Sequence, residues 1–216
     1  MTDTARRTVL LAVAAAPFAA LLAPGATARA AGLDTLEIQI RVAGWAADEP
    51  RQVGLALTGR LDAPTKDAVR RFQGAHGLRQ DGIVDERTRE ALTALAKPDG
   101  STRHFDWTAF SPDGTFAGGA ADEATVREHV RRLMYRLEAL RHKVDGREIT
   151  VTSGFHTHGG AHALGGAADV VIADSTTYAA YRAAQTCGFT ELGMYTQSWL
   201  HVDILPSAFT WADGVV

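Results

Sequence analysis

Three residues of this chain, His162, Asp169 and His201, have the types and spacing that could bind a metal ion. Six residues separate His162 from Asp169, and His201 follows much later, in the segment W-L-H-V-D-I (199–204). Two imidazoles and one carboxylate form a ligand set that a catalytic Zn²⁺ uses when its fourth position stays open for water. We therefore expect one Zn²⁺ per chain if the fold brings these side chains together.

Strands are expected to position two of these ligands. The segment 165–170 alternates so that Asp169 projects from one face of a strand, with small residues beside it that leave room for an ion. In 199–204, apolar residues alternate with His201 and Asp203, which is the period of a strand with one apolar and one polar face. His201 and Asp203 are therefore predicted to point to the same side, into the site.

The strings S-G-F-H…H-A-L-G-G-A-A-D (153–169) and H-V-D (201–203) resemble the zinc D-alanyl-D-alanine peptidases. That family includes D,D-carboxypeptidases, D,D-dipeptidases and peptidoglycan endopeptidases, and the resemblance covers about residues 105–212. It implies that His162, Asp169 and His201 hold zinc, and it points to Ser153 and His156 as substrate-binding residues. Many relatives that trim a C-terminal D-alanine have an arginine where this chain has His156.

The sequence does not identify the residue that acts as the general base. Many relatives carry it two, three or five residues before the last ligand, where this chain has Trp199, Ser198 and Thr196. Asp203 is the first candidate, because it shares a strand face with His201 and could accept a proton from a metal-bound water. Its alternative role is to orient a ligand histidine. Three residues are weaker candidates, because nothing in the sequence fixes their distance from the metal: Glu191, His156 and His158.

These residues predict a peptidase that uses metal-activated water and forms no covalent intermediate. The family resemblance implies that it trims a terminal D-alanine or cuts a cross-link in peptidoglycan stem peptides. The alternative is a non-catalytic wall-binding protein with a degenerate zinc site. Cys187 ends an apolar helical stretch and is predicted to be a buried bystander rather than a nucleophile.

Residues 1–30 are predicted to be a signal peptide, so the protein is expected to be secreted or associated with the cell wall. Arg6 and Arg7 precede an apolar, alanine-rich run, and Ala28-Arg29-Ala30 forms a small-x-small cleavage site. The arginine pair fits twin-arginine export, with the general secretory route as the alternative. An N-terminal membrane anchor is the competing interpretation, but Pro17 and Pro24 interrupt the run. After cleavage we expect no membrane contact.

Residues 32–97 contain an internal repeat, in which 57–69 and 80–92 align at an offset of 23. Each half has a turn glycine, an N-capping aspartate and an amphipathic helix. A third helix is expected at 34–43, with Leu36, Ile40 and Ala43 on one side. The order F-Q-x-x-x-G-L…D-G-x-x-D (72–85) resembles the peptidoglycan-binding domain found beside many cell-wall hydrolases. That resemblance implies a three-helix bundle with peptidoglycan as partner; a generic helical spacer is the alternative.

The remaining chain is predicted to be an α+β domain at 105–216, joined by a linker at 98–104 that is rich in Pro and Gly. Helices are expected at 122–142 and 175–186, and strands at 147–154 and 199–204, which gives a small, mostly antiparallel sheet. The net charge is −3 and the chain has no Lys/Arg run, so nucleic acid is excluded as an expected partner. We expect a monomer.

Overall fold

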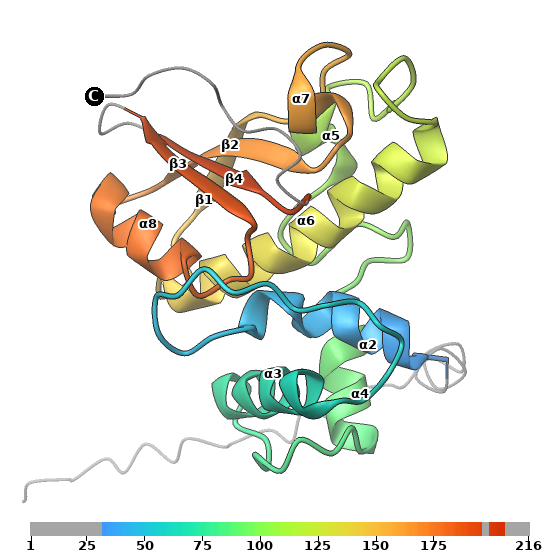
Figure 1. Ribbon diagram of the computed structural model, residues 1–216, viewed down its shortest axis with the longest axis vertical. Helices are drawn as coiled ribbons and strands as arrows, with labels where there is room; N and C mark the ends of the chain where they lie inside the picture. The colour runs from blue at the N-terminus through green and yellow to red at the C-terminus, as the bar shows by residue number, and fades with distance from the viewer. Residues whose placement is uncertain (1–31, 196–198, 206–216) are drawn as a thin grey trace, which may run out of the picture.

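The computed structural model describes residues 32–195 and 199–205. It shows a small helical unit below a larger unit with a sheet, and helix α2 (Thr35–Val42) of the helical unit lies at the boundary with the larger unit (Figure 1). The predicted fold class, an α+β domain with an antiparallel sheet preceded by a helical bundle, is confirmed. The predicted signal peptide, residues 1–30, lies outside the described residues.

The helical unit consists of α2 (Thr35–Val42), a short 3-10 helix η1 (Ala43–Trp45), α3 (Ala63–Ala75) and α4 (Glu86–Thr93). Each α-helix begins after an aspartate whose side chain accepts a backbone N–H of the first turn, which satisfies one of the donors that a helix start leaves unpaired. The capping residues are Asp34, Asp62 and Asp85. The predicted caps at Asp62 and Asp85 are confirmed.

A buried glutamine closes each of the two repeats. Gln73 accepts the N–H of Gly82 at 2.9 Å and donates to the carbonyl of Ile83 and the hydroxyl of Thr88. Gln39 makes the equivalent three contacts with Gly59, Arg60 and Thr65 in the first repeat. Gly59 and Gly82 have positive φ, +70° and +74°, which an L side chain rarely adopts. The repeat is therefore a helix that carries a glutamine, a glycine turn and a capped second helix.

One prediction about α2 was wrong. Leu36 was expected on the apolar face, but its side chain is 39% exposed, whereas Ile38 and Val42 are buried. The physical reason is that α2 packs against α3 on one side and against α6 (Glu123–Lys143) of the larger unit on another. A helix covered from two sides has no single apolar stripe, so helical periodicity alone misplaces its buried face.

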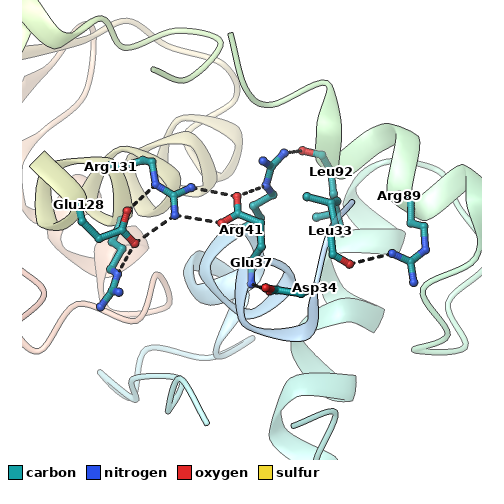
Figure 2. A network of polar contacts seen from close by, with 9 residues as sticks. Leu33, Asp34, Glu37, Arg41, Arg89, Leu92, Glu128 and Arg131 are labelled. Atoms are coloured by element: carbon teal, nitrogen blue, oxygen red, sulfur yellow. Dashed lines mark hydrogen bonds and ion pairs between the residues drawn. The ribbon is translucent and has the colours of Figure 1, made fainter. Parts of the chain in front are cut away.

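Ion pairs and a turn also connect the two units. Arg131 of α6 donates to both carboxylate oxygens of Glu37 in α2, each at 2.9 Å, and also to Glu128 (Figure 2). The segment predicted as a linker forms a closed turn, in which Lys97 N–H donates to Ser101 at 2.9 Å. His104 then binds Glu138 of α6 through its backbone N–H and its ring.

The larger unit contains α5 (Trp107–Phe110), α6, α7 (Gly160–Ala163) and α8 (Thr177–Ala184). Its four strands are β1 (Ile149–Ser153), β2 (Ala167–Ile172), β3 (Glu191–Tyr195) and β4 (Trp199–Asp203). They form one antiparallel sheet in the order β1-β2-β4-β3. One face of the sheet packs on α6 and α8 and is buried, with Val170, Leu200 and Val202 each at most 1% exposed. The other face carries the predicted metal ligands.

Candidate metal centre

The three predicted ligands come together on the face of the sheet that α6 and α8 do not cover. Asp169 on β2 and His201 on β4 are directly paired in the antiparallel register, so their side chains leave the sheet on the same side. His162 reaches the same point from the short helix α7. One ligand atom from each of the three residues lies within 4.8 Å of the others. Residues far apart in the sequence therefore form one cluster.

Hydrogen bonds orient these side chains. Nδ1 of His162 lies 2.7 Å from the carbonyl oxygen of Gly154, which can only accept, so Nδ1 carries the proton. That tautomer leaves Nε2 of His162 as the metal-binding atom, 3.7 Å from Oδ1 of Asp169. Nδ1 of His201 lies 2.9 Å from the same oxygen. A backbone carbonyl behind a ligand imidazole is the arrangement that fixes ring orientation in zinc sites.

The electrostatics favour a carboxylate in the middle of this cluster. Burial raises the pKa of Asp169, but the two neighbouring imidazoles, His162 and His201, together outweigh it and lower that pKa to about 2. Burial lowers the pKa of His162, but the neighbouring Asp169 carboxylate and the carbonyl of Gly154 together outweigh this and raise that pKa. Asp169 is therefore ionised at neutral pH, as a carboxylate ligand must be.

The donor set and its spacing fit a zinc ion. Nitrogen and oxygen ligands lie about 2.0–2.1 Å from Zn²⁺, and two such atoms on a tetrahedron are about 3.3 Å apart. The two separations from Asp169 Oδ1, 3.7 Å to His162 and 2.9 Å to His201, lie on either side of that value. Both separations therefore differ from the tetrahedral value by about 0.4 Å.

Asp203 lies two residues after His201 on β4, on the same side of the sheet and opposite Ala167 of β2. Its side chain is buried, and its Oδ1 accepts the backbone N–H of Leu205 at 2.7 Å. Burial raises the pKa of Asp203, and the nearby carboxylate of Glu191 raises it further. Glu191 is directly paired with Asp203 across β3 and β4. Either predicted role for Asp203 is compatible with this position.

The two predicted substrate-binding residues also border the cluster. Ser153 is paired with Asp169 across β1 and β2. The ring of His156 is exposed and stacks on the ring of His162, with centroids 4.8 Å apart and planes 14° apart. His158, by contrast, is bonded to the hydroxyl of its neighbour Thr157. The contact of Ser153 and His156 with substrate stays a prediction.

Two features of the site were missed by sequence analysis. His129 of α6 holds the loop before β2, because its Nδ1 lies 2.7 Å from the carbonyl oxygen of Leu164; no local pattern indicates that contact. Tyr195 and Trp199 stack beside His201, with centroids 4.2 Å apart. The alternation in 191–195 and 199–203 could have placed both rings on the face that carries the ligands.

Cys187 is buried, and burial raises the pKa of its thiol.

Two comparisons with known proteins agree with these observations. Residues 32–92 match the family described as "Putative peptidoglycan binding domain". The zinc D-Ala-D-Ala carboxypeptidase of Streptomyces albus G is 32% identical over 212 residues, covering 83% of this chain and 82% of that protein. The chain belongs to the zinc D-Ala-D-Ala peptidase family. The family resemblance predicted from the two histidine strings and from the repeat is confirmed.

Membership of this family agrees with the donor set that the fold assembles, two imidazoles and one carboxylate. It also accounts for the two units, since a segment of the peptidoglycan-binding type precedes the unit that carries the metal ligands. In the part of the chain that the structure describes, no helix is both long and apolar enough to cross a membrane.

Proposed function

We propose that this protein is an exported zinc peptidase that hydrolyses peptide bonds in peptidoglycan stem peptides. The bond would be that of a terminal D-alanine or that of a cross-link. The observation that carries the proposal is the convergence of His162, Asp169 and His201 on one point. The relative from Streptomyces albus G, a zinc D-Ala-D-Ala carboxypeptidase, supports both the metal and the class of substrate.

The residues around the metal centre would have different roles in this reaction. A zinc ion held by His162, Asp169 and His201 would supply Lewis acidity that polarises a carbonyl and lowers the pKa of a water. Gly154 keeps the proton of His162 on Nδ1, so that Nε2 stays available to the metal. Oδ1 of Asp203 is engaged by the N–H of Leu205, so Oδ2 is the atom proposed to take a proton and pass it to the leaving amine.

The unit at 32–97 would hold the enzyme on its polymeric substrate. Its match to a peptidoglycan-binding family supports peptidoglycan as the partner. Binding to the wall raises the local concentration of stem peptides near the metal site, which increases the rate on an insoluble substrate. We propose that the protein acts outside the cell as a monomer, without nucleic acid or membrane as a partner.

A wall-binding protein without catalysis is the second candidate. It is favoured by Trp199, which stands at one of the positions where relatives carry the general base and whose ring is stacked on Tyr195. An indole cannot take up a proton at neutral pH. In this alternative the three ligands would hold a structural ion or none, and Asp203 would only orient His201.

One experiment separates the two candidates. Purified sacculi are incubated with the protein, with and without a zinc chelator, and the released muropeptides are analysed. The peptidase predicts chelator-sensitive products that His201→Ala abolishes together with zinc binding. Asp203→Asn should keep the zinc and reduce the rate, and full activity of that variant would remove Asp203 as the base. Sacculus binding without any product would support the second candidate.

A further inference from the structure

An aromatic pair, Tyr195 and Trp199, lies immediately beside the metal centre on the same face of the sheet. Tyr195 of β3 is paired with Trp199 of β4, two residues along each strand from the pair of Gly193 and His201. Their rings stack with centroids 4.2 Å apart and planes 14° apart. Directly paired residues share a face, so both rings lie on the side that carries His201.

Gly193 lets the tyrosine ring lie against the strand. A Cβ added at Gly193 would be 2.7 Å from Cε2 of Tyr195 and 3.3 Å from Cβ of His201. The ring of Tyr195 therefore folds back over residue 193, next to the ligand histidine, in space that any other residue would fill. The backbone of Gly193 is not in the left-handed region, so its conformation does not require a glycine. The close approach of the Tyr195 ring does require one.

The aromatic pair continues an accessible apolar strip that leads away from the metal. Tyr195 and Trp199 are both partly exposed. Val171, two residues after Asp169 on β2 and therefore on the same face, is 36% exposed. Apolar side chains that stay accessible beside a site, rather than joining the core, are typical of a surface that receives a ligand.

The opposite side of the metal centre has different chemistry. There the paired residues are Glu191 and Asp203, two carboxylates. Two carboxylates repel the anionic end of a stem peptide and offer no apolar contact to a long side chain. The apolar part of a substrate side chain on the acyl side is therefore better accommodated on the other side of the metal centre, over Tyr195 and Trp199.

We propose that Tyr195 and Trp199 form the subsite for the stem-peptide residue that precedes the two D-alanines, on the acyl side of the scissile bond. Aromatic faces bind the methylene chains and methyl groups of such residues, and a stacked pair is rigid enough to do so at low cost in conformational entropy. The pair is a specificity determinant and takes no part in proton transfer. This inference rests on the proposed function, because that function defines the two sides of the bond.

The test compares two peptides, N-acetyl-X-D-Ala-D-Ala with X either glycine or an ε-acetylated lysine. We expect the wild-type protein to prefer the lysine peptide, and we expect Tyr195→Ala and Trp199→Ala to remove about tenfold of that preference, mainly through KM. The zinc content should be unchanged in both variants, and Tyr195→Phe should keep the preference. Tyr178→Ala is the matched control, because Tyr178 is a 65% exposed aromatic residue on α8, which packs on the opposite face.

Calorimetric titration of both peptides into metal-free protein gives a second readout that does not need catalysis. The subsite is supported if the two alanine variants lose the difference in affinity between the peptides and Tyr178→Ala keeps it. This result would support the subsite even if no hydrolysis is detected, and in that case the proposed function alone fails. A preference that survives both alanine variants overturns the inference. So does a wild-type protein that treats the two peptides alike in both readouts.

Discussion

Replacing Arg131 by alanine tests whether the helical unit and the metal-binding unit form one packed body. The Arg131 guanidinium makes two hydrogen bonds of 2.9 Å to Glu37 across the boundary, and the side chains of Arg131 and Glu37 are only 19% and 21% exposed. Exposed ion pairs contribute about 0–1 kcal/mol, whereas breaking a buried pair costs about 3–5 kcal/mol. Glu37 keeps a second partner, Arg41, at 2.6 Å. We therefore expect Arg131→Ala to lower the free energy of unfolding by about 2 kcal/mol.

The assay is urea unfolding of Arg131→Ala, Glu37→Ala and the double variant. The coupling energy between the two residues should be about 1–2 kcal/mol. The control is the pair Arg70 and Asp67, whose side chains are 46% and 50% exposed, and its coupling should stay below about 0.5 kcal/mol. If the coupling energy of Arg131 with Glu37 is no larger than that of the control pair, this ion pair does not stabilise the boundary between the two units.

Three further outcomes are expected. Gln73→Ala leaves the N–H of Gly82 unpaired and removes one of two hydrogen bonds from both the carbonyl of Ile83 and the hydroxyl of Thr88, so urea unfolding should show a loss of about 2–3 kcal/mol; a loss below about 0.5 kcal/mol, the level of an ordinary surface change, would contradict the buried network. Gly154→Ala places a Cβ 2.4 Å from the carbonyl oxygen of Phe110 and must shift the backbone that holds His162, so zinc affinity should fall by about 10–100-fold in a competition titration with a chelator. The pKa of His142 is lowered, first by burial and second by the nearby His76. As the pH falls, His142 is therefore protonated in the unfolded state before it is protonated in the folded state, and the free energy of unfolding decreases below about pH 6.5. His142→Phe should flatten this acid-side slope, and an unchanged slope would refute the assignment.

Much of the metal centre could be predicted from the sequence, because the residues next to each ligand in the sequence determine its strand and the face on which it lies. The alternation around Asp169 and His201 fixes two strands and the face of each ligand, and an antiparallel pairing of those strands then brings the ligands together. The caps at Asp62 and Asp85 were predictable for the same reason, since an N-cap acts within three residues of itself.

The features that could not be predicted depend on contacts between distant segments. The buried face of α2 is set by α6, so Leu36 was placed wrongly. Gln73 looks like any polar residue of a helix until the glycine turn folds back onto it. The stacking of Tyr195 on Trp199 needs the register of β3 on β4, which periodicity does not give.

The central claim is that His162, Asp169 and His201 share one divalent cation, and elemental analysis tests it most directly. Purified protein is loaded with zinc, freed of excess metal and analysed beside His162→Ala, Asp169→Ala and Asp203→Asn. We expect about one zinc ion per chain in the wild type and in Asp203→Asn, and none in the two ligand variants. A wild-type protein without stoichiometric metal, or ligand variants that keep the metal, would contradict a cation shared by these three residues.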